Sequence, residues 1–241
     1  MVDFAGSHVV VTGGTGALGR AVVAALRAAG AVCHLPNLVA AELDDFPHRH
    51  DAGVHITRNI DVADEAAVQR FYQGLPPLWA SIHLAGGFAM APIGDMSAAD
   101  FVAQFRMNAL SAFLCSAAAI GAFRRRPGPG PSGARGGRIV NIAARPALEP
   151  RHGAGMVAYA AAKSAVAALT QALAEETVAE EIWINAIAPS ILDTPANRDA
   201  MPNADHGRWV PPAEAADLIA FLASPQNRVT RGAVIPVYGG S

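Results

Sequence analysis

The sequence predicts a doubly wound α/β protein, in which two layers of helices cover a seven-stranded parallel sheet. Three observations predict this fold class. Short runs of β-branched residues alternate with alanine-rich helical stretches along the whole chain, which is typical of consecutive βαβ units. A glycine-rich turn at residues 12–19 joins the first strand-like run to the first helical stretch. The hydrophobic content is 52% but the aromatic content only 6%, as expected where helices lie close against a buried sheet.

Each strand is expected at a short β-branched or apolar run, and each helix at an alanine-rich stretch between two such runs. The strands are expected at residues 8–11, 31–35, 54–60, 79–85, 138–142, 182–187 and 233–237. The helices are expected at residues 17–29, 64–73, 98–123, 156–177 and 212–222. Right-handed crossovers place the loops after the strands at one edge of such a sheet, where these folds bind ligands.

The chain is expected to form a single domain over residues 1–241. Its length suits one sizeable domain, and no stretch near its middle has the composition of an interdomain linker. Residues 124–137 begin with three arginines and continue in proline and glycine. This composition predicts a flexible loop insertion between a helix and the fifth strand.

Charge and cysteine content narrow the classes of partner. Lys and Arg number 18 against 20 Asp and Glu, so no positive field is present to collect nucleic acid, and we expect none as a partner. Cys33 and Cys115 lie in apolar runs, which predicts buried free thiols in a reducing cytoplasm. We expect no membrane partner, because the chain starts without a cationic leader and no uncharged apolar run approaches roughly 20 residues. We also expect no metal, because His48 and His50 lie in a polar connector without ligand spacing.

The turn at residues 12–19 predicts a dinucleotide site. Gly14, Gly16 and Gly19 satisfy the pattern G-x-G-x-x-G directly after a strand and at the start of a helix. A turn without Cβ atoms lets a pyrophosphate approach the backbone, and the helix N-terminus offers it free N–H groups. The residues expected to bind the cofactor here are Gly13, Gly14, Thr15, Gly16, Ala17, Leu18 and Gly19.

The choice between NAD and NADP stays open in the sequence. An acidic residue at the end of the second strand would bind a ribose hydroxyl, and an arginine would accept a 2′-phosphate. Residues 33–37 contain neither. Asn37 could bind a ribose hydroxyl without repelling a phosphate. Asp61 and Val62, after the third strand, lie where an adenine would rest, although Asp61 could equally be a helix N-terminal residue.

Tyr159 and Lys163 form the candidate acid/base pair. Four residues apart on a helix, their side chains lie on one face. A free tyrosine titrates near pH 10, and a neighbouring ammonium together with a positively charged cofactor would favour the phenolate. A tyrosine and a lysine at this spacing also occur by chance on solvated helix faces, so the assignment depends on the motifs around them.

These motifs together resemble the short-chain dehydrogenase/reductase family. The resemblance rests on the turn at residues 12–19, the Ala-Gly-Gly segment at 85–87, Asn108, and Tyr159 with Lys163. It extends through residues 185–189 and 221–224 and so covers nearly the whole chain. It implies a Rossmann-type fold and hydride transfer with a nicotinamide cofactor.

The resemblance also implies roles for individual residues. Tyr159 would be the acid/base, Lys163 would bind the nicotinamide ribose and lower the tyrosine pKa, and Asn108 would hold a proton-relay water. Thr194 would contact the carboxamide. The cofactor site would then also include Ala85, Gly86, Gly87, Asn108, Tyr159, Lys163, Pro189, Ile191 and Thr194.

Three departures from the family pattern stand out. Ala17 replaces the central turn glycine, and His83 begins the segment that reads Asn-Asn-Ala-Gly in the family. The serine usual after the fifth strand aligns with Ala143 or Ala144, and neither has a hydroxyl. Loss of one donor to a developing oxyanion typically lowers the rate by about 10²–10³, a heavy penalty for ketone or alcohol chemistry.

The missing hydroxyl and the segments at 192–198 and 201–205 resemble the dihydropteridine reductase-like branch of the family. That branch implies reduction of a quinonoid pterin or conjugated imine, which needs no oxyanion hole. Carbonyl or alcohol oxidoreduction is the alternative, and a catalytically silent nucleotide-sensing protein is the rival from another class. Residues 193–195 could also be only a helix-initiation turn.

The expected substrate neighbours are Phe88, His152, Ile191, Trp209 and a lid at residues 193–206, and Trp209 could equally be only an anchor for that lid. The long helices at 98–123 and 156–177 are rich in alanine and serine. Small side chains let helices approach closely, so we expect a homodimer or homotetramer through these two helices. Alternatively, both helices only cover the sheet.

Overall fold

The computed structural model describes residues 2–4 and 6–241. Seven strands form one parallel sheet in the order β3-β2-β1-β4-β5-β6-β7. This arrangement confirms the predicted fold class. The strands are β1 (His8–Thr12), β2 (Val32–Asn37), β3 (Val54–Arg58), β4 (Leu78–His83), β5 (Gly137–Ile142), β6 (Ile182–Pro189) and β7 (Val234–Val237).

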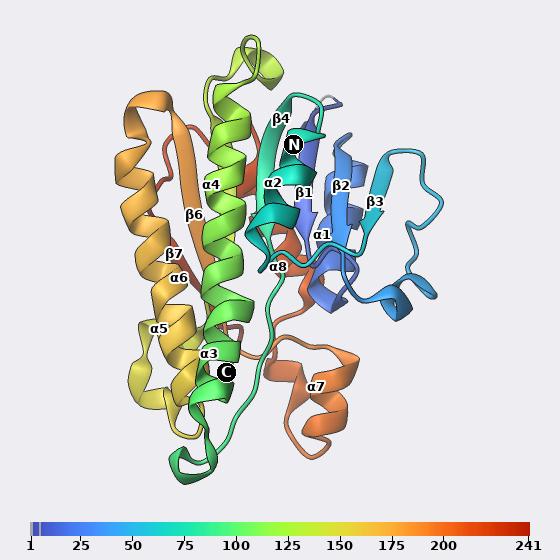
Figure 1. The fold of residues 1–241 in the computed structure, drawn as a ribbon. Helices are drawn as coiled ribbons and strands as arrows, with labels where there is room; N and C mark the ends of the chain where they lie inside the picture. The colour runs from blue at the N-terminus through green and yellow to red at the C-terminus, as the bar shows by residue number, and fades with distance from the viewer. Residues whose placement is uncertain (1, 5) are drawn as a thin grey trace.

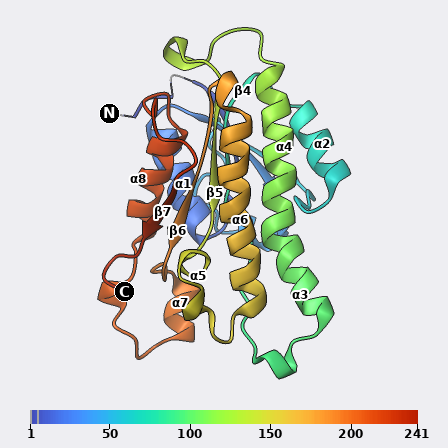
Figure 2. The ribbon, with the colours of Figure 1, turned by 90° about the vertical axis from the view of Figure 1, so that its left-hand side faces the viewer.

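A layer of helices covers each face of the sheet (Figure 1; Figure 2). On one face α1 (Ala17–Ala28) lies beside α8 (Pro212–Ala223), and their side chains share an apolar core with the strands. On the other face α2 (Glu65–Gln73), α4 (Ser111–Arg124) and α6 (Val157–Glu176) enclose a second core. Cys33 lies in the first core and Cys115 in the second, both as free thiols, which confirms that they are buried.

The predicted long helix at 98–123 is divided. It consists of α3 (Ala98–Phe105), a π-helical turn η3 (Arg106–Leu110) and α4. The wider turn occurs where Asn108 is buried against Gly87. Such turns often mark functional sites.

The third strand is shorter than predicted. It ends at Arg58 because Asn59 adopts a left-handed conformation with φ of 60°, which turns the chain out of the sheet.

Two helical stretches, Ala98–Arg124 and Val157–Glu176, are long and apolar enough to cross a membrane by length and composition. Both stretches contain charged residues, among them Arg106 and Lys163, so the expectation about uncharged apolar runs is not contradicted. Core helices pass the same test, and 50% and 39% of these two windows is buried inside the protein. Both stretches lie against the sheet, which accounts for their apolar composition.

The predicted flexible segment at 124–137 joins α4 to β5. Arg126 donates hydrogen bonds to the carbonyls of Leu78 (3.1 Å) and Gly136 (2.7 Å), and its guanidinium lies 5.5 Å from the centre of the Trp79 ring. The segment is therefore attached to the start of β4. Its flexibility stays a prediction.

The segments that follow the strands gather at one end of the sheet. Figure 1 shows the loop after β4 together with α5 (Arg145–Leu148) and α7 (Pro195–Ala200) at the lower end. β1 and β4 are neighbours there, although β2 and β3 lie between them in the chain. The chain reverses its direction of winding at this point, which is where ligands bind in such sheets.

Candidate active site

The glycine turn forms a cradle without side chains. Gly13 has φ of 64°, and a Cβ on it would lie 2.8 Å from the backbone nitrogen of Ala85. A Cβ on Gly19 would lie 2.1 Å from the carbonyl oxygen of Gly13. Gly16 caps α1 without any side-chain hydrogen bond, so the N–H groups of the first helical turn stay open to a ligand.

A cavity of about 220 Å³ lies over this turn. A pyrophosphate fits its chemistry, because its floor is backbone and the start of a helix. Thr12 accepts a hydrogen bond of 3.1 Å from the backbone of Ala85 and so fastens the loop after β4 to the turn. The lining residues are Gly13, Gly16, Ala17, Leu18, Gly19, Glu42, Leu84, Ala85 and Gly86. Ala17 is exposed, so its methyl group fits where the family has glycine.

Gly86 joins the cavity to the predicted acid/base pair. A Cβ on Gly86 would lie 2.6 Å from Oδ1 of Asn108 and 3.5 Å from Nζ of Lys163. The same residue lines the dinucleotide cavity. Residues far apart in the sequence are thus brought together at the carboxyl ends of β4 and β5.

Asn108 is held rigidly by its π-helical turn. Its amide nitrogen donates to the carbonyls of Gly87 and Gln104, each at 3.0 Å, and its Oδ1 accepts from the nitrogen of Gly87 at 3.3 Å. The side chain therefore fixes the loop after β4. Its role in holding a relay water stays a prediction.

Tyr159 and Lys163 lie on one face of α6, as predicted. Nζ of Lys163 donates to the carbonyl of Ile142 at 2.8 Å and lies 5.8 Å from the centre of the Tyr159 ring. Phe88 covers Tyr159 edge-to-face with ring centres 5.0 Å apart. The pair therefore lies between β5 and the loop after β4.

Burial shifts both groups towards their neutral forms. It raises the pKa of Tyr159 to about 12 and lowers the pKa of Lys163 to about 8, because the charged form loses its hydration. For Tyr159 this is opposite to the expected shift towards phenolate. In the protein alone, desolvation decides the state of the phenol, which stays protonated at neutral pH.

The two residues that follow β5, Ala143 and Ala144, carry no hydroxyl. Ala143 and Ala144 are both buried, and the nitrogen of Ala143 donates to Ile187 at 2.9 Å. Ala144 precedes α5 without a side-chain cap.

The segment after β6 is ordered and closes on itself. Thr194 caps α7 through a 3.2 Å bond from the nitrogen of Asn197, with Pro195 next. Residues 193–195 therefore do form the turn that starts a helix, which was the alternative explanation for their sequence. Asp193 forms an ion pair with Arg198, and a bridge between Leu192 and Val210 closes the base of the segment.

The other predicted substrate neighbours differ in exposure. His152 is exposed and lies 3.5 Å from Glu149. Trp209 is 5% exposed and lies against His206, with ring centres 4.4 Å apart, which matches an anchor for the lid. Ile191 is half-buried and binds the backbone of Val210 through its carbonyl. Pro189 ends β6.

Asp61 does not cap the following helix. The cap of α2 is Asp64, which accepts from the nitrogen of Ala67 at 2.9 Å. Asp61 instead accepts from the nitrogen of Ala63 at 2.8 Å and pairs with Arg106 at 3.1 Å. Its place beside an adenine, with Val62, stays a prediction.

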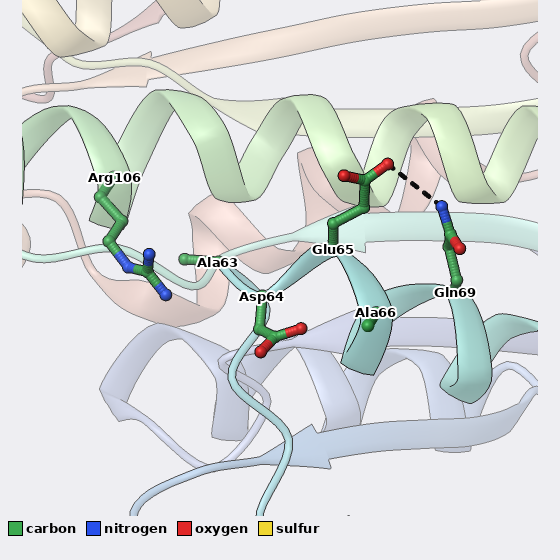
Figure 3. A pocket seen from close by; sticks show the side chains of 6 residues that line it. All are labelled: Ala63, Asp64, Glu65, Ala66, Gln69 and Arg106. Carbon is green, nitrogen blue, oxygen red and sulfur yellow. Dashed lines mark hydrogen bonds between the residues drawn. The ribbon is translucent and has the colours of Figure 1, made fainter.

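A separate hollow of about 500 Å³ lies at the start of α2 (Figure 3). Arg106 faces the hollow from η3. On the other side, the amide of Gln69 donates a hydrogen bond of 3.2 Å to the carboxylate of Glu65. Its lining consists of Ala63, Asp64, Glu65, Ala66, Gln69 and Arg106. Neither the glycine turn nor Tyr159 contributes to it, so it is separate from the acid/base pair.

Comparisons with known proteins identify the family of this chain. The family model for short chain dehydrogenase matches residues 7–205. The chain is 32% identical over 182 residues to the uncharacterised oxidoreductase YohF of Escherichia coli, covering 72% of this chain and 68% of that protein. It is 27% identical over 246 residues to L-xylulose reductase of Bos taurus, covering 98% and 96%.

A solved short-chain type dehydrogenase/reductase from Mycobacterium ulcerans has a TM-score of 0.86 to this chain at 23% identity, with 99% of this chain and 90% of that chain covered. The two chains therefore share the same fold. The chain belongs to the short-chain dehydrogenase family. It is an oxidoreductase, and the enzymes of this family use NAD or NADP.

Two sets of residues were missed in the sequence. Glu42 lines the dinucleotide cavity, although no role was expected for it. The signal was present, because an acidic residue about 20 positions after the glycine turn is the usual ribose partner. The second set is His83 and Asn141, which belong to a buried series of hydrogen bonds. No sequence motif indicates this series, because it depends on the register between neighbouring strands.

Proposed function

We propose that the protein reduces a planar conjugated acceptor, such as a quinonoid pterin or a conjugated imine. The glycine turn with Gly86 would hold NADH or NADPH, which supplies the hydride when bound. Lys163 would hold the nicotinamide ribose, and Tyr159 would donate the proton. The single observation that carries this proposal is the half-buried phenol of Tyr159 beside Lys163, without a hydroxyl at 143 or 144.

The state of Tyr159 supports the reductive direction. A phenol whose pKa is raised to about 12 keeps its proton at neutral pH and can give it to a reduced product. An alcohol oxidation would instead need the phenolate as a base, which burial disfavours.

The surroundings of Tyr159 support an apolar, planar substrate. Phe88 is 58% exposed and Met90 60% exposed, both on the loop after β4. Phe88 already contacts Tyr159 edge-to-face. The backbone of Ala91 donates to Gly155 at 2.9 Å, which holds this loop beside the start of α6. Aromatic faces of this kind favour stacking of a conjugated ring.

The absent hydroxyl supports chemistry without an oxyanion hole. Reduction of a carbonyl builds charge on one oxygen, which a serine would stabilise. Reduction of a conjugated ring spreads that charge over several atoms. Ala143 and Ala144 fit the second case, as in the resemblance to the dihydropteridine reductase-like branch.

The direct test is Tyr159→Phe in an assay of NADH and NADPH oxidation. The acceptors are quinonoid dihydropterin, quinones and simple ketones. We expect turnover with a conjugated acceptor in the wild type, a loss of at least about 10² in the variant, and nearly unchanged cofactor affinity. Unchanged turnover in the variant would remove Tyr159 from the mechanism.

Carbonyl or alcohol oxidoreduction is the second candidate. It is favoured by the likeness to L-xylulose reductase of Bos taurus, at 27% identity over 98% of this chain. Ala144→Ser separates the two candidates. A gain of about 10² on ketones would identify a carbonyl reductase that has lost one donor, whereas no gain favours the conjugated acceptor.

We also propose self-association through the face of α3, η3, α4 and α6, in a protein of the cytoplasm. Five apolar side chains are partly exposed on the first three elements: Phe101, Val102, Met107, Leu110 and Phe113. Val157 on α6 is 44% exposed. An isologous contact would bury this patch. Val102→Glu should shift the molar mass measured by light scattering towards the monomer, and an unchanged mass would place the contact elsewhere.

A further inference from the structure

Glu42 is the only charged residue that lines the dinucleotide cavity in the described part of the chain. It lies in the short 3₁₀ helix η1 (Ala40–Leu43) that follows β2. The same cavity is bounded by Gly16 and Leu18 of the glycine turn. A carboxylate from the segment after β2 therefore lines the cavity beside the glycine turn.

Hydrogen bonds fix this carboxylate towards the turn. The hydroxyl of Thr15 donates to Oε2 of Glu42. The same hydroxyl accepts from the amide of Asn37 at 3.2 Å, so its proton is directed to Glu42. Thr15 is buried, which limits the freedom of the pair.

The same bonds remove Asn37 as a donor to a ribose. Its amide nitrogen has two hydrogens, and these go to the hydroxyl of Thr15 at 3.2 Å and the carbonyl of Val39 at 3.1 Å. Asn37 is also only 3% exposed. Its Oδ1 can still accept a hydrogen bond, but the carboxylate of half-buried Glu42 is the more accessible acceptor.

The nearest arginine on α1 is already engaged. Arg20 donates to the carbonyl of Thr15 at 2.9 Å, to the carbonyl of Glu42 at 3.2 Å and to the carboxylate of Asp45 at 2.5 Å. Its guanidinium forms an ion pair with Asp45 and bonds the backbone carbonyl of Glu42, and its charge also attracts the Glu42 carboxylate. Arg58 lies opposite Asn37 in the strand pairing and is exposed; it is the alternative partner for a phosphate.

We propose that Glu42 makes the protein selective for NAD over NADP. Its carboxylate would accept a hydrogen bond from the adenosine ribose and would repel a 2′-phosphate at the same place. The inference rests on the dinucleotide site of the proposed function. It adds that Glu42 determines the selectivity between NAD and NADP.

The test is direct binding of NADH and NADPH, measured by calorimetry without substrate. We expect the wild type to bind NADH about 10²-fold more tightly than NADPH, since a like-charge contact of this kind is strongly unfavourable. Glu42→Gln should bring the two dissociation constants to within about tenfold, mainly by tightening NADPH. Asp44→Asn is the matched control, because it removes the same charge two residues away at an exposed side chain outside the cavity, and its selectivity should equal that of the wild type.

Three outcomes would overturn the inference. The first is a wild type that binds NADPH as tightly as NADH or more tightly. The second is a ratio of the two dissociation constants that does not change in Glu42→Gln. The third is tight NADPH binding that is lost in Arg58→Ala, which would assign the phosphate to Arg58. If neither dinucleotide binds, the proposed function falls together with the inference. If both bind without selectivity, only the inference falls.

Discussion

At the scale of single residues, the chemistry depends on two groups, Tyr159 and Lys163, whose pKa values burial shifts in favour of the neutral form. Within residues 2–4 and 6–241, no carboxylate forms an ion pair with Lys163; its ammonium donates to the backbone carbonyl of Ile142 at 2.8 Å. Burial alone lowers its pKa to about 8. The Lys163 side chain is therefore mostly protonated and positively charged below about pH 8, and mostly neutral above it.

This state predicts the pH dependence of turnover. The rate with saturating NADH should be constant below about pH 7 and fall as the pH rises through about 8, because the ammonium that holds the ribose loses its proton. Lys163→Arg keeps the charge and should move this limb upward by more than one pH unit while lowering the rate. A limb that stays near pH 8 in the variant would assign it to another group.

The glycine turn gives a second prediction at this scale. Gly19→Ala places a Cβ 2.1 Å from the carbonyl of Gly13, so the turn must move. We expect the free energy of unfolding to fall by about 1–3 kcal/mol and dinucleotide binding to be lost. Gly94→Ala is the control, since its added Cβ meets nothing within 4 Å. Equal effects of the two substitutions in urea unfolding would contradict the steric argument.

At the scale of elements, a buried chain of hydrogen bonds fastens α6 to the sheet. Tyr72 bonds Ser81 at 2.7 Å, Ser81 bonds His83 at 2.8 Å, and His83 bonds Asn141 at 2.8 Å. The amide of Asn141 then donates to Thr170 on α6 at 3.0 Å, and Thr170 donates to the carbonyl of Val166. Since Ile142 holds Lys163, two consecutive residues of β5 hold one face of α6.

Thr170→Val tests this attachment. It leaves the amide of buried Asn141 without an acceptor, so the free energy of unfolding should fall by about 1–3 kcal/mol. Loosening of α6 should lower kcat/KM by about tenfold through Lys163, and Thr170→Ser should restore both. Thr177→Val is the matched control on the same helix, because that hydroxyl only donates to backbone carbonyls. The same loss of kcat/KM in Thr177→Val would contradict a specific role for Thr170.

Alternation of strand-like and helical runs predicted the sheet and the main helices from the sequence, because each run matches one layer of the fold. The π-helical turn at Arg106–Leu110 was not predictable, since it depends on the burial of Asn108 against another segment. The end of β3 was missed because Asn59 leaves the sheet through a left-handed conformation. Of the site, Tyr159 and Lys163 were predictable from helical spacing, whereas the direction of their pKa shifts depends on burial.

At the scale of the whole molecule, buried histidines predict sensitivity to acid. Burial lowers the pKa of His34 and of His83 to about 4 from 6.5. The unfolded chain takes up these protons near pH 6.5 and the folded chain only near pH 4. Stability is therefore complete above pH 6.5 and falls between these values, by about 3 kcal/mol for fully buried His83.

Urea unfolding at pH 7.5, 6 and 5 measures this loss. His34→Gln should flatten the dependence, because the residue that must stay neutral beside His8 is gone. His152→Gln is the control, since the side chain of His152 is 60% exposed, and it should follow the wild type. A wild-type stability that is constant from pH 7.5 to 5 would contradict this prediction.

The fold brings the glycine turn, Asn108, Tyr159 and Lys163 together where β1 and β4 meet and the loops after the strands converge. The measurement that tests this most directly is a crystal structure of the complex with NADH. We predict the nicotinamide beside the hydroxyl of Tyr159, the ribose on Nζ of Lys163 and the pyrophosphate on the glycine turn. A nicotinamide bound away from Tyr159, or a phenol turned into the protein interior, would contradict the account.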